Sequence, residues 1–352
     1  MTDFEILDLT NVQKWNSYLK QLPIDQQDIC YTPEYYKLYE ELGHGKATCF
    51  VYRDTDNIAL YPFLLNSVND IGYNLDNKYY DIQGAYGYNG VVTNSSNQIF
   101  RNNFYYAFND FCRSNYIIAE FTRFNPIMGN NQFSEWLSPI NTMGNVVVNL
   151  SQDNIEKDSY EYSTRKNINK AKKSHLSAFK IGSNELTNEY LNEFMKIYYD
   201  TMKRNKADEY YYFPITFFEN ISRYLKNKFY YYFVSYENTI ISTELVLNGN
   251  EISYSFLGGT LGEFFQYRPN DFLKDFIIKD LKNHGSKFFC LGGGSEGVFK
   301  FKKSFSKNGV YPFFIGKKIH NLSIYNDVVG QWESKYPEKI ENYKNFLLKY
   351  HY

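Results

Sequence analysis

One carboxylate in the second half of the sequence lies in a run that predicts a β-strand. Glu244 stands in Ser242-Thr243-Glu244-Leu245-Val246, among apolar and β-branched side chains. A carboxylate buried in such surroundings is poorly solvated in its charged form and accepts a proton more readily. Glu244 is therefore a candidate catalytic base that could remove a proton from the ammonium group of a substrate. The alternative is that Glu244 faces solvent on the open side of the strand.

A second group of candidates surrounds the predicted start of a helix at Pro269. Proline suits the first turn of a helix, and the free amides of a helix N-terminus suit a pyrophosphate. We therefore expect that the glycine-containing loop that feeds this helix can bind a pyrophosphate. Its candidate residues are Gly258, Gly259, Arg268, Asn270 and Asp271. Asp271 could instead serve only as a cap for the helix.

A cationic run, residues 163–173, lies between the two halves and reads Ser-Thr-Arg-Lys-Asn-Ile-Asn-Lys-Ala-Lys-Lys. Thr164 can cap a helix, and helical spacing then sets several of the cations on neighbouring faces. This pattern is typical of a solvated helix face. It also suits the phosphates of a nucleotide, a pyrophosphate or an RNA backbone. Arg165 is the candidate from this run for binding the phosphates of a donor substrate.

Tyrosine, amide and arginine side chains in the first half could line an acceptor pocket. Hydroxyl and amide groups suit sugar hydroxyls, and an arginine suits a phosphate or a carboxylate. The candidates are Tyr86, Tyr88, Asn89, Arg123 and Asn125. Structural roles for the tyrosines are the alternative.

Several other kinds of site are excluded by spacing. Residues 292–297 spell GxGxxG, but they lie near the end of the chain, whereas a dinucleotide-binding fold carries this motif in an early βαβ unit. The five histidines are far apart and the four cysteines are scattered, so we expect no metal site and a reducing compartment. No Ser-His-Asp or Cys-His arrangement is plausible either.

The elements that must position these residues form an internal repeat. A proline followed by aromatic residues opens a helical stretch at Pro33 and again at Pro214. Each stretch precedes two alternating runs that predict a β-hairpin, 48–53 with 58–65 and 229–236 with 240–247. A glycine-containing loop, a helix and a strand follow in each half: 84–90, 98–114 and 117–122, then 258–262, 269–284 and 287–291. Unless this similarity arises by chance from the biased composition, the pattern predicts mixed α/β sheets in both halves. A further helix is expected over 331–352.

The length of 352 residues fits two domains of ordinary size. The 38 basic and 39 acidic residues nearly cancel, so no overall field would draw the chain to nucleic acid or to an acidic membrane. No apolar run is long enough to span a bilayer. We therefore expect a cytoplasmic protein with, at most, peripheral membrane contact.

With these segments in view, the sequence resembles the FemAB-like branch of the GNAT superfamily, the nonribosomal peptidyltransferases and related acyltransferases of envelope assembly. Residues 86–90, Tyr-Gly-Tyr-Asn-Gly, resemble the family's YGYxG loop, and residues 165–171 are similar to its R-x-N-I-x-K-A helix start. Residues 197–204 resemble its Y-x-x-T-x-x-R helix. Residues 291–294 with 301–305 resemble its closing GGG…FK-x-x-F signature.

This resemblance implies two tandem GNAT-like domains of mixed α/β sheets, with the active groove between them. We place the domains at 1–155, against which 318–352 packs, and at 156–317. The resemblance also adds Tyr199 and Arg204 to the acceptor-binding candidates, and it implies that the candidates around Pro269 bind the acyl donor. Lys302 matches the FK lysine and becomes a candidate catalytic residue that holds the substrate carbonyl or the charge of the leaving group. Its alternative is a solvated role among Lys300 and Lys303.

The expected function is transfer of an acyl group from acyl-CoA to an amino group of a sugar or cell-envelope precursor. The acceptor would be a nucleotide-sugar, a lipid-linked sugar or a peptidoglycan precursor, and no cofactor would be tightly bound. One alternative is peptidyl transfer for peptidoglycan with an aminoacyl-tRNA as donor, which would require tRNA contacts from the lysine-rich helix. Another is a non-catalytic carbohydrate-binding protein with a duplicated fold.

Overall fold

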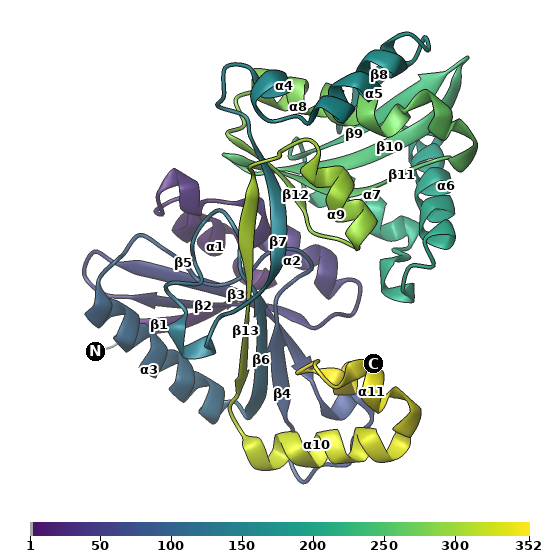
Figure 1. The fold of residues 1–352 in the computed structure, drawn as a ribbon. Coiled ribbons are helices and arrows are strands. Elements are labelled where there is room, and N and C mark those ends of the chain that lie inside the picture. Colours follow the sequence, from purple (N-terminus) through teal and green to yellow (C-terminus); the bar gives the residue numbers. More distant parts are fainter. Residues whose placement is uncertain (1–2) are drawn as a thin grey trace. The chain divides into compact units, whose positions relative to one another are not determined.

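The computed structural model describes residues 3–352, which form two compact units. Unit 1 contains the chain up to Thr142 together with Phe313–Tyr352, and unit 2 contains Met143–Pro312. The chain passes from one unit to the other within two strands, β7 (Ile140–Asn149) and β13 (Val310–Ile319) (Figure 1).

The sheet of unit 1 has one parallel pair of neighbouring strands. Its strands follow the order β1 (Asp3–Asp8), β2 (Lys46–Arg53), β3 (Ile58–Ser67), β4 (Tyr80–Gln83), β6 (Ile117–Arg123) and β13. The short strand β5 (Val92–Thr93) pairs with β3. β4 and β6 run parallel and are joined through α3 (Gln98–Ser114), while the other pairs are antiparallel. This is the arrangement that a strand-helix-strand crossover requires.

Helix α3 forms because an apolar stripe and a cap agree on its position. Asn97 accepts hydrogen bonds from the amides of Ile99 and Phe100, and so caps the first turn. Phenylalanines at helical spacing then pack on the aromatic face of β2 and β3; they are Phe100, Phe104, Phe108 and Phe111. Helices α1 (Val12–Leu19) and α2 (Pro33–Glu40) also belong to this unit.

The C-terminal helix differs from the expectation. Asn321 caps α10 (Leu322–Lys335), and Pro337 follows its end, so the expected helix over 331–352 is wrong in its bounds. Only the short α11 (Ile340–Tyr343) follows as an α-helix. Val328 and Trp332 of α10 pack with Ile118 of β6, and the segment around Leu348 and Tyr350 joins the same apolar cluster.

The sheet of unit 2 repeats this plan. Its order is β8 (Ser177–Ile181), β9 (Phe229–Tyr236), β10 (Thr239–Asn248), β11 (Ile252–Thr260), β12 (Phe288–Gly292) and β7. β11 and β12 run parallel and are connected through α8 (Pro269–Asn283). The repeated order of hairpin, strand, helix and parallel strand confirms the expected mixed α/β fold.

Alternation along β9 sends neighbouring side chains to opposite faces of this sheet. Tyr232 joins the cluster formed with α8 and with α5 (Tyr162–Lys172). Tyr231 instead meets Phe194 of α6 (Asn188–Arg204), on the face that α7 (Ile215–Tyr224) also contacts through Phe218. Two short helices, α4 (Ile155–Asp158) and α9 (Glu296–Lys303), complete the unit.

The last strand of each sheet comes from the other half of the chain. β7 follows β6 in sequence but pairs with β12, through Val146 to Asn149. β13 follows β12 but pairs with β6, through Ile315 to Ile319. Among residues 3–352, no helix has both the length and the apolar character needed to cross a membrane.

Candidate active site

The candidate site of unit 2 lies where its two parallel strands part. β11 pairs with β12 only from Ile252 to Tyr254. From Ser255 onward β11 pairs with β10 alone, and Phe256 is an extra residue between the pairs Leu245–Leu257 and Val246–Ser255. Such a bulge bends a strand, and bulges are frequent beside active sites. In open α/β sheets, ligands bind outside the carboxyl ends of parallel strands at a point like this one.

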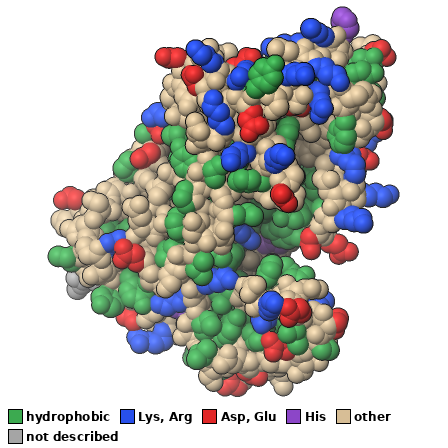
Figure 2. Space-filling model, in the orientation of Figure 1, with side chains coloured by type: hydrophobic (Ala, Val, Ile, Leu, Met, Phe, Trp, Pro, Cys, Tyr) green, Lys and Arg blue, Asp and Glu red, His purple; other side chains and the backbone are tan. Residues whose placement is uncertain are grey.

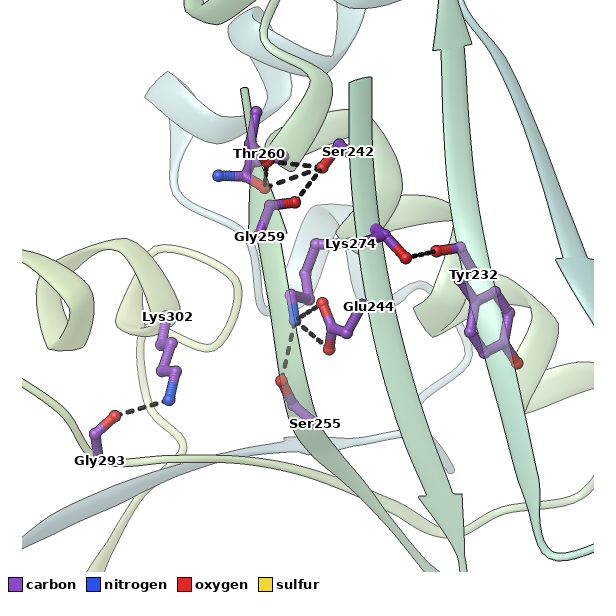
Figure 3. A network of polar contacts seen from close by, with 11 residues as sticks. Tyr232, Ser242, Glu244, Ser255, Gly259, Thr260, Lys274, Gly293 and Lys302 are labelled. Carbon is purple, nitrogen blue, oxygen red and sulfur yellow. Dashed lines mark hydrogen bonds and ion pairs between the residues drawn. The ribbon is translucent and has the colours of Figure 1, made fainter. Parts of the chain in front are cut away.

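A buried ion pair lies beside this parting. The Nζ of Lys274, from α8, donates to both carboxylate oxygens of Glu244, at 2.6 and 2.5 Å, and to the hydroxyl of Ser255 at 3.2 Å (Figure 3). Glu244 and Lys274 are only 7% and 5% exposed, so the expectation that Glu244 faces solvent is wrong. The carboxylate of Glu244 therefore neutralises the buried Lys274 ammonium through both of its oxygens.

Lys302 approaches the same place from α9. Its Nζ donates to the carbonyl oxygen of Gly293, just after β12, at 2.6 Å (Figure 3). Burial and, to a smaller extent, the nearby Lys274 cation lower the pKa of Lys302 to about 8, while the Glu244 carboxylate opposes the shift. Lys300 and Lys303 are exposed. Lys302 thus differs from its neighbours in pointing toward polar groups of the protein, and it loses its charge as pH rises through about 8.

The two glycines assigned to a donor loop lie on a strand instead. Gly258 and Gly259 belong to β11, so the expectation of a loop there is wrong. A Cβ on Gly258 would lie 2.6 Å from the carbonyl oxygen of Thr243, and one on Gly259 would lie 2.7 Å from that of Ile197. The absence of side chains lets β10 and α6 pack closely against β11.

Helix α8 starts at the expected position, but the polar side chains of Asn270 and Asp271 make hydrogen bonds to other residues of unit 2. Arg268 is the exposed N-cap, with φ 61°, and no side chain caps the helix, so Asp271 does not act as a cap. Asp271 accepts from Asn167 of α5 at 3.1 Å, and burial raises the pKa of its carboxyl group. Asn270 accepts from Ser242 at 3.2 Å and from the hydroxyl of Thr260.

The cationic run forms α5 and divides into an inward and an outward part. Arg165 donates to the carbonyl oxygens of Tyr160, at 2.7 Å, and Glu156, at 3.3 Å, so its guanidinium holds the preceding turn. The lysines are exposed; they are Lys166, Lys170, Lys172 and Lys173. Figure 2 shows Lys and Arg side chains gathered over this part of unit 2.

The acceptor candidates of unit 1 include two buried structural amides. Asn89 is fully buried and donates to the carbonyl oxygen of Ala85 at 2.9 Å. Asn125 is 1% exposed and accepts from the amide of Ile127 at 2.9 Å. Both therefore hold loops in place. Tyr86 and Tyr88 are half-buried, with the carbonyl oxygen of Tyr86 fixed by the hydroxyl of Tyr35 at 2.5 Å.

Arg123 stands apart from these loop residues, because its side chain lines a separate pocket of unit 1 with the C-terminal segment. The two candidates from α6, Tyr199 and Arg204, belong to unit 2. Tyr199 donates to the carbonyl oxygen of Phe213 at 2.5 Å, and Arg204 donates to Asp200 at 2.7 Å and to the carbonyl oxygen of Thr260 at 2.9 Å. Arg204 thereby ties α6 to the end of β11.

Lys274 and Ser255 are the polar residues of this place that the sequence analysis missed. One signal was available for Lys274. It lies beside Leu273 and three or four residues before Ile277 and Ile278, on the apolar side of α8, where an unpaired lysine would be costly. A buried lysine implies a buried carboxylate partner, and Glu244 was the acid already singled out.

Comparisons with known proteins agree with this architecture. A family model described as an acetyltransferase (GNAT) domain matches residues 159–303. A comparison with curated protein sequences finds no match. Among solved structures, FemX superposes with a TM-score of 0.66 at 15% identity, over 92% of this chain and 99% of that one.

Two further structures share the fold at lower similarity. The C-terminal domain of a putative lysylphosphatidylglycerol synthetase from Agrobacterium fabrum gives a TM-score of 0.54 at 10% identity, over 93% of this chain and 96% of that one. A tandem GNAT protein from the clavulanic acid biosynthesis pathway, solved without AcCoA, gives a TM-score of 0.52 at 8% identity, over 90% of this chain and 98% of that one. Residues 159–303 therefore match the GNAT acetyltransferase domain model, and the chain as a whole shares its fold with FemX and with the tandem GNAT protein.

Proposed function

We propose that unit 2 is an N-acyltransferase that moves an acyl group from acyl-CoA to a primary amine where β11 and β12 part. The observation that carries this proposal is the Lys302 ammonium at that point, with a pKa lowered to about 8, inside a GNAT acetyltransferase domain. A lysine in such a place can offer a hydrogen bond and a positive charge to an oxygen or sulfur atom that becomes negative during the reaction.

In the proposed reaction the neutral amine attacks the carbonyl carbon of the thioester. The C–N bond forms, the carbonyl oxygen becomes an oxyanion, and Lys302 donates a hydrogen bond to this oxygen. The C–S bond then breaks, and the proton lost by the amine ends on the thiol of the leaving group. Glu244 acts here as a positioning residue, because its charge neutralises Lys274 and helps Lys302 to keep its proton.

The donor assignment rests on the start of α8. Its first turn has no side-chain cap and carries Arg268 as an exposed cation, an arrangement that suits a pyrophosphate. The second candidate donor is an aminoacyl-tRNA, which the exposed lysines of α5 favour. For the acceptor we propose an amino group on a sugar or cell-envelope precursor, supported by the likeness to FemX.

The test combines binding with turnover. Purified protein is heated with acetyl-CoA or with a pool of aminoacylated tRNA, each at low and high salt, and acyl transfer to amino sugars is then followed. Stabilisation by acetyl-CoA at both salt concentrations, with turnover that Lys302→Met lowers strongly and Lys303→Met preserves, supports the proposal. Salt-sensitive stabilisation by tRNA alone would establish the second donor instead. Sugar binding without turnover, unaffected by Lys302→Met, would indicate a non-catalytic carbohydrate-binding protein.

A further inference from the structure

Unit 1 contains a cavity of about 200 Å³ that none of the proposed chemistry uses. One wall is formed by the ends of β4 and β6 and the middle of β13, through Gln83, Phe121, Arg123, Ile315 and Lys317. The other wall is the C-terminal segment, through residues 345–348, 351 and 352. The cavity therefore lies wholly within unit 1, between the sheet and the last residues of the chain.

Arg123 is the exceptional residue of this cavity. Its guanidinium lies 5.1 Å from the ring centre of Phe121. Within residues 3–352, no carboxylate or carbonyl oxygen accepts a hydrogen bond from this guanidinium. A guanidinium offers a planar fork of donors that matches a carboxylate or a phosphate. A half-buried guanidinium without an acceptor in the wall of a cavity therefore suits an anion.

The other polar groups of the cavity are already fixed in place. Lys317 donates from its Nζ to the carbonyl oxygen of Asn345 at 2.6 Å, which leaves its charge unneutralised but holds its position. His351 pairs with the buried carboxylate of Asp81 at 2.6 Å, so this pair anchors the C-terminal wall to β4. Arg123 and Lys317 thus face the cavity, and neither is paired with a carboxylate in the described part of the chain. The contacts of Lys317 with Asn345 and of His351 with Asp81 hold the two walls together.

Size and apolar lining limit what such an anion can be. The cavity is larger than the ~150 Å³ apolar cavity that holds benzene, and smaller than the ~300 Å³ at which pockets for drug-sized ligands begin. Phe121, Ile315, Leu347 and Leu348 supply apolar surface around the guanidinium. One ring or a short branched chain therefore fits, together with a single anionic group.

We propose that this cavity is a binding site for a small organic monoanion, a carboxylate carried on one aromatic ring or a compact aliphatic group. The carboxylate would accept a bidentate hydrogen bond from Arg123, with the Lys317 charge nearby. The apolar body would replace water against Phe121, Ile315 and Leu347. The proposal does not depend on the acyltransfer reaction, because every group that it uses belongs to unit 1.

The test uses 4-fluorobenzoate as the probe, with binding followed by ¹⁹F NMR and by calorimetry on the full chain. We expect a Kd of about 1 mM or tighter, in keeping with so few atoms. Arg123→Gln should weaken binding at least about 10-fold, because a charge-assisted pair is lost. Arg113→Gln is the matched control, since Arg113 is an exposed arginine of the same unit that pairs with Asp110, and it should bind as the wild type does.

Two further measurements make the outcome decisive. Leu347→Trp should fill the cavity and abolish binding even if Arg123→Gln fails to fold. Neutral 4-fluorobenzamide should bind at least about 10-fold more weakly than the carboxylate. Phenyl phosphate tests whether the anionic group is a phosphate. If phenyl phosphate bound more tightly than 4-fluorobenzoate, the assignment to a carboxylate would be overturned. No binding of 4-fluorobenzoate, equal binding of the benzamide, or an unchanged Kd in Leu347→Trp would overturn the site itself.

Discussion

Lys302 donates a hydrogen bond to the carbonyl oxygen of Gly293 at 2.6 Å, at the end of the one strand that runs parallel to β11. This bond fixes the ammonium, while burial and the Lys274 cation lower its pKa to about 8. A substrate oxyanion is a stronger acceptor than a backbone carbonyl, so a reacting thioester would gain from this ammonium mainly in its transition state. Lys302 therefore has the placement expected of a group that acts on rate more than on binding.

The first prediction concerns the charge of Lys302. Lys302→Met should lower kcat by about 10² to 10³ with little change in KM, the loss expected for one oxyanion donor. Because the cationic form is the active one, kcat of the wild type should fall as pH rises through about 8. Lys302→Arg retains its charge at this pH and should shift the decline to higher pH. These profiles are measured by the release of free CoA thiol.

The control for this experiment is the exposed neighbour Lys303, and Lys303→Met should leave the pH profile unchanged. If kcat instead rose through about pH 8 and Lys302→Arg lost this rise, the neutral amine of Lys302 would be the active form, acting as a base.

The second prediction concerns the buried pair of Glu244 and Lys274. Glu244→Gln should destabilise unit 2 by about 3 to 5 kcal/mol, because the Lys274 ammonium is left buried without a carboxylate. Glu244→Leu combined with Lys274→Met should recover most of this loss, since two apolar groups need no partner. Hydrogen exchange of the β10 and β11 amides in urea measures both effects. A double variant no more stable than the single one would show that the pair is not an isolated unit.

The third prediction concerns the close approach of α6 to β11. Gly259→Ala should destabilise unit 2 by about 1 to 3 kcal/mol, because the new methyl group would press against the carbonyl oxygen of Ile197. Gly297→Ala, in α9, is the matched control. Nothing lies within 4 Å of a Cβ at that position, so a gain of about 0.5 to 1 kcal/mol is expected from helix propensity. The same hydrogen-exchange measurement compares them, and equal effects would argue against the steric explanation.

Much of the fold could be predicted because local patterns determine it. The helix expected over 98–114 is α3, and the strand expected over 229–236 is β9, with the same bounds. Each has a strong period of its own, an apolar stripe in α3 and alternation in β9. The helix expected over 331–352 has no capping residue at its start, and Pro337 interrupts it. The observed helix α10 begins instead after the cap Asn321 and ends before Pro337.

What could not be predicted depends on contacts between distant residues. The strands β7 and β13 were not predicted, and no local pattern in the sequence indicates which sheet each one joins. The same limit applies to the candidate site. Glu244 was noticed as an acid in an apolar strand, whereas its partner Lys274 lies 30 positions further on, in a helix whose other lysines are not buried. The glycines of β11 were read as a loop because glycine usually interrupts a strand, but here the packing of β10 and α6 requires them.

The last prediction concerns the pH dependence of unit 1. Burial tends to lower the pKa of His351, but the charge and hydrogen bond of Asp81 outweigh burial and raise this pKa above its usual 6.5. The stabilisation by this pair is therefore fully present below about pH 6.5 and is lost as pH rises through the raised pKa of His351. Tryptophan fluorescence reports on unit 1 alone, because Trp15, Trp136 and Trp332 all lie in it. Trp332 also donates to the carbonyl oxygen of Tyr352, beside His351.

Urea unfolding of the wild type, followed by this fluorescence, should therefore show a lower free energy of unfolding on the alkaline side of the raised pKa than below it. His351→Gln should cost about 1.5 to 3 kcal/mol at low pH, as expected for a hydrogen bond to a charged group, and should reduce the difference between the two pH values. His175→Gln, at an exposed position of unit 2, should behave as the wild type does. If His351→Gln kept the full pH dependence, the charge on this histidine would not be what holds the C-terminal segment against β4.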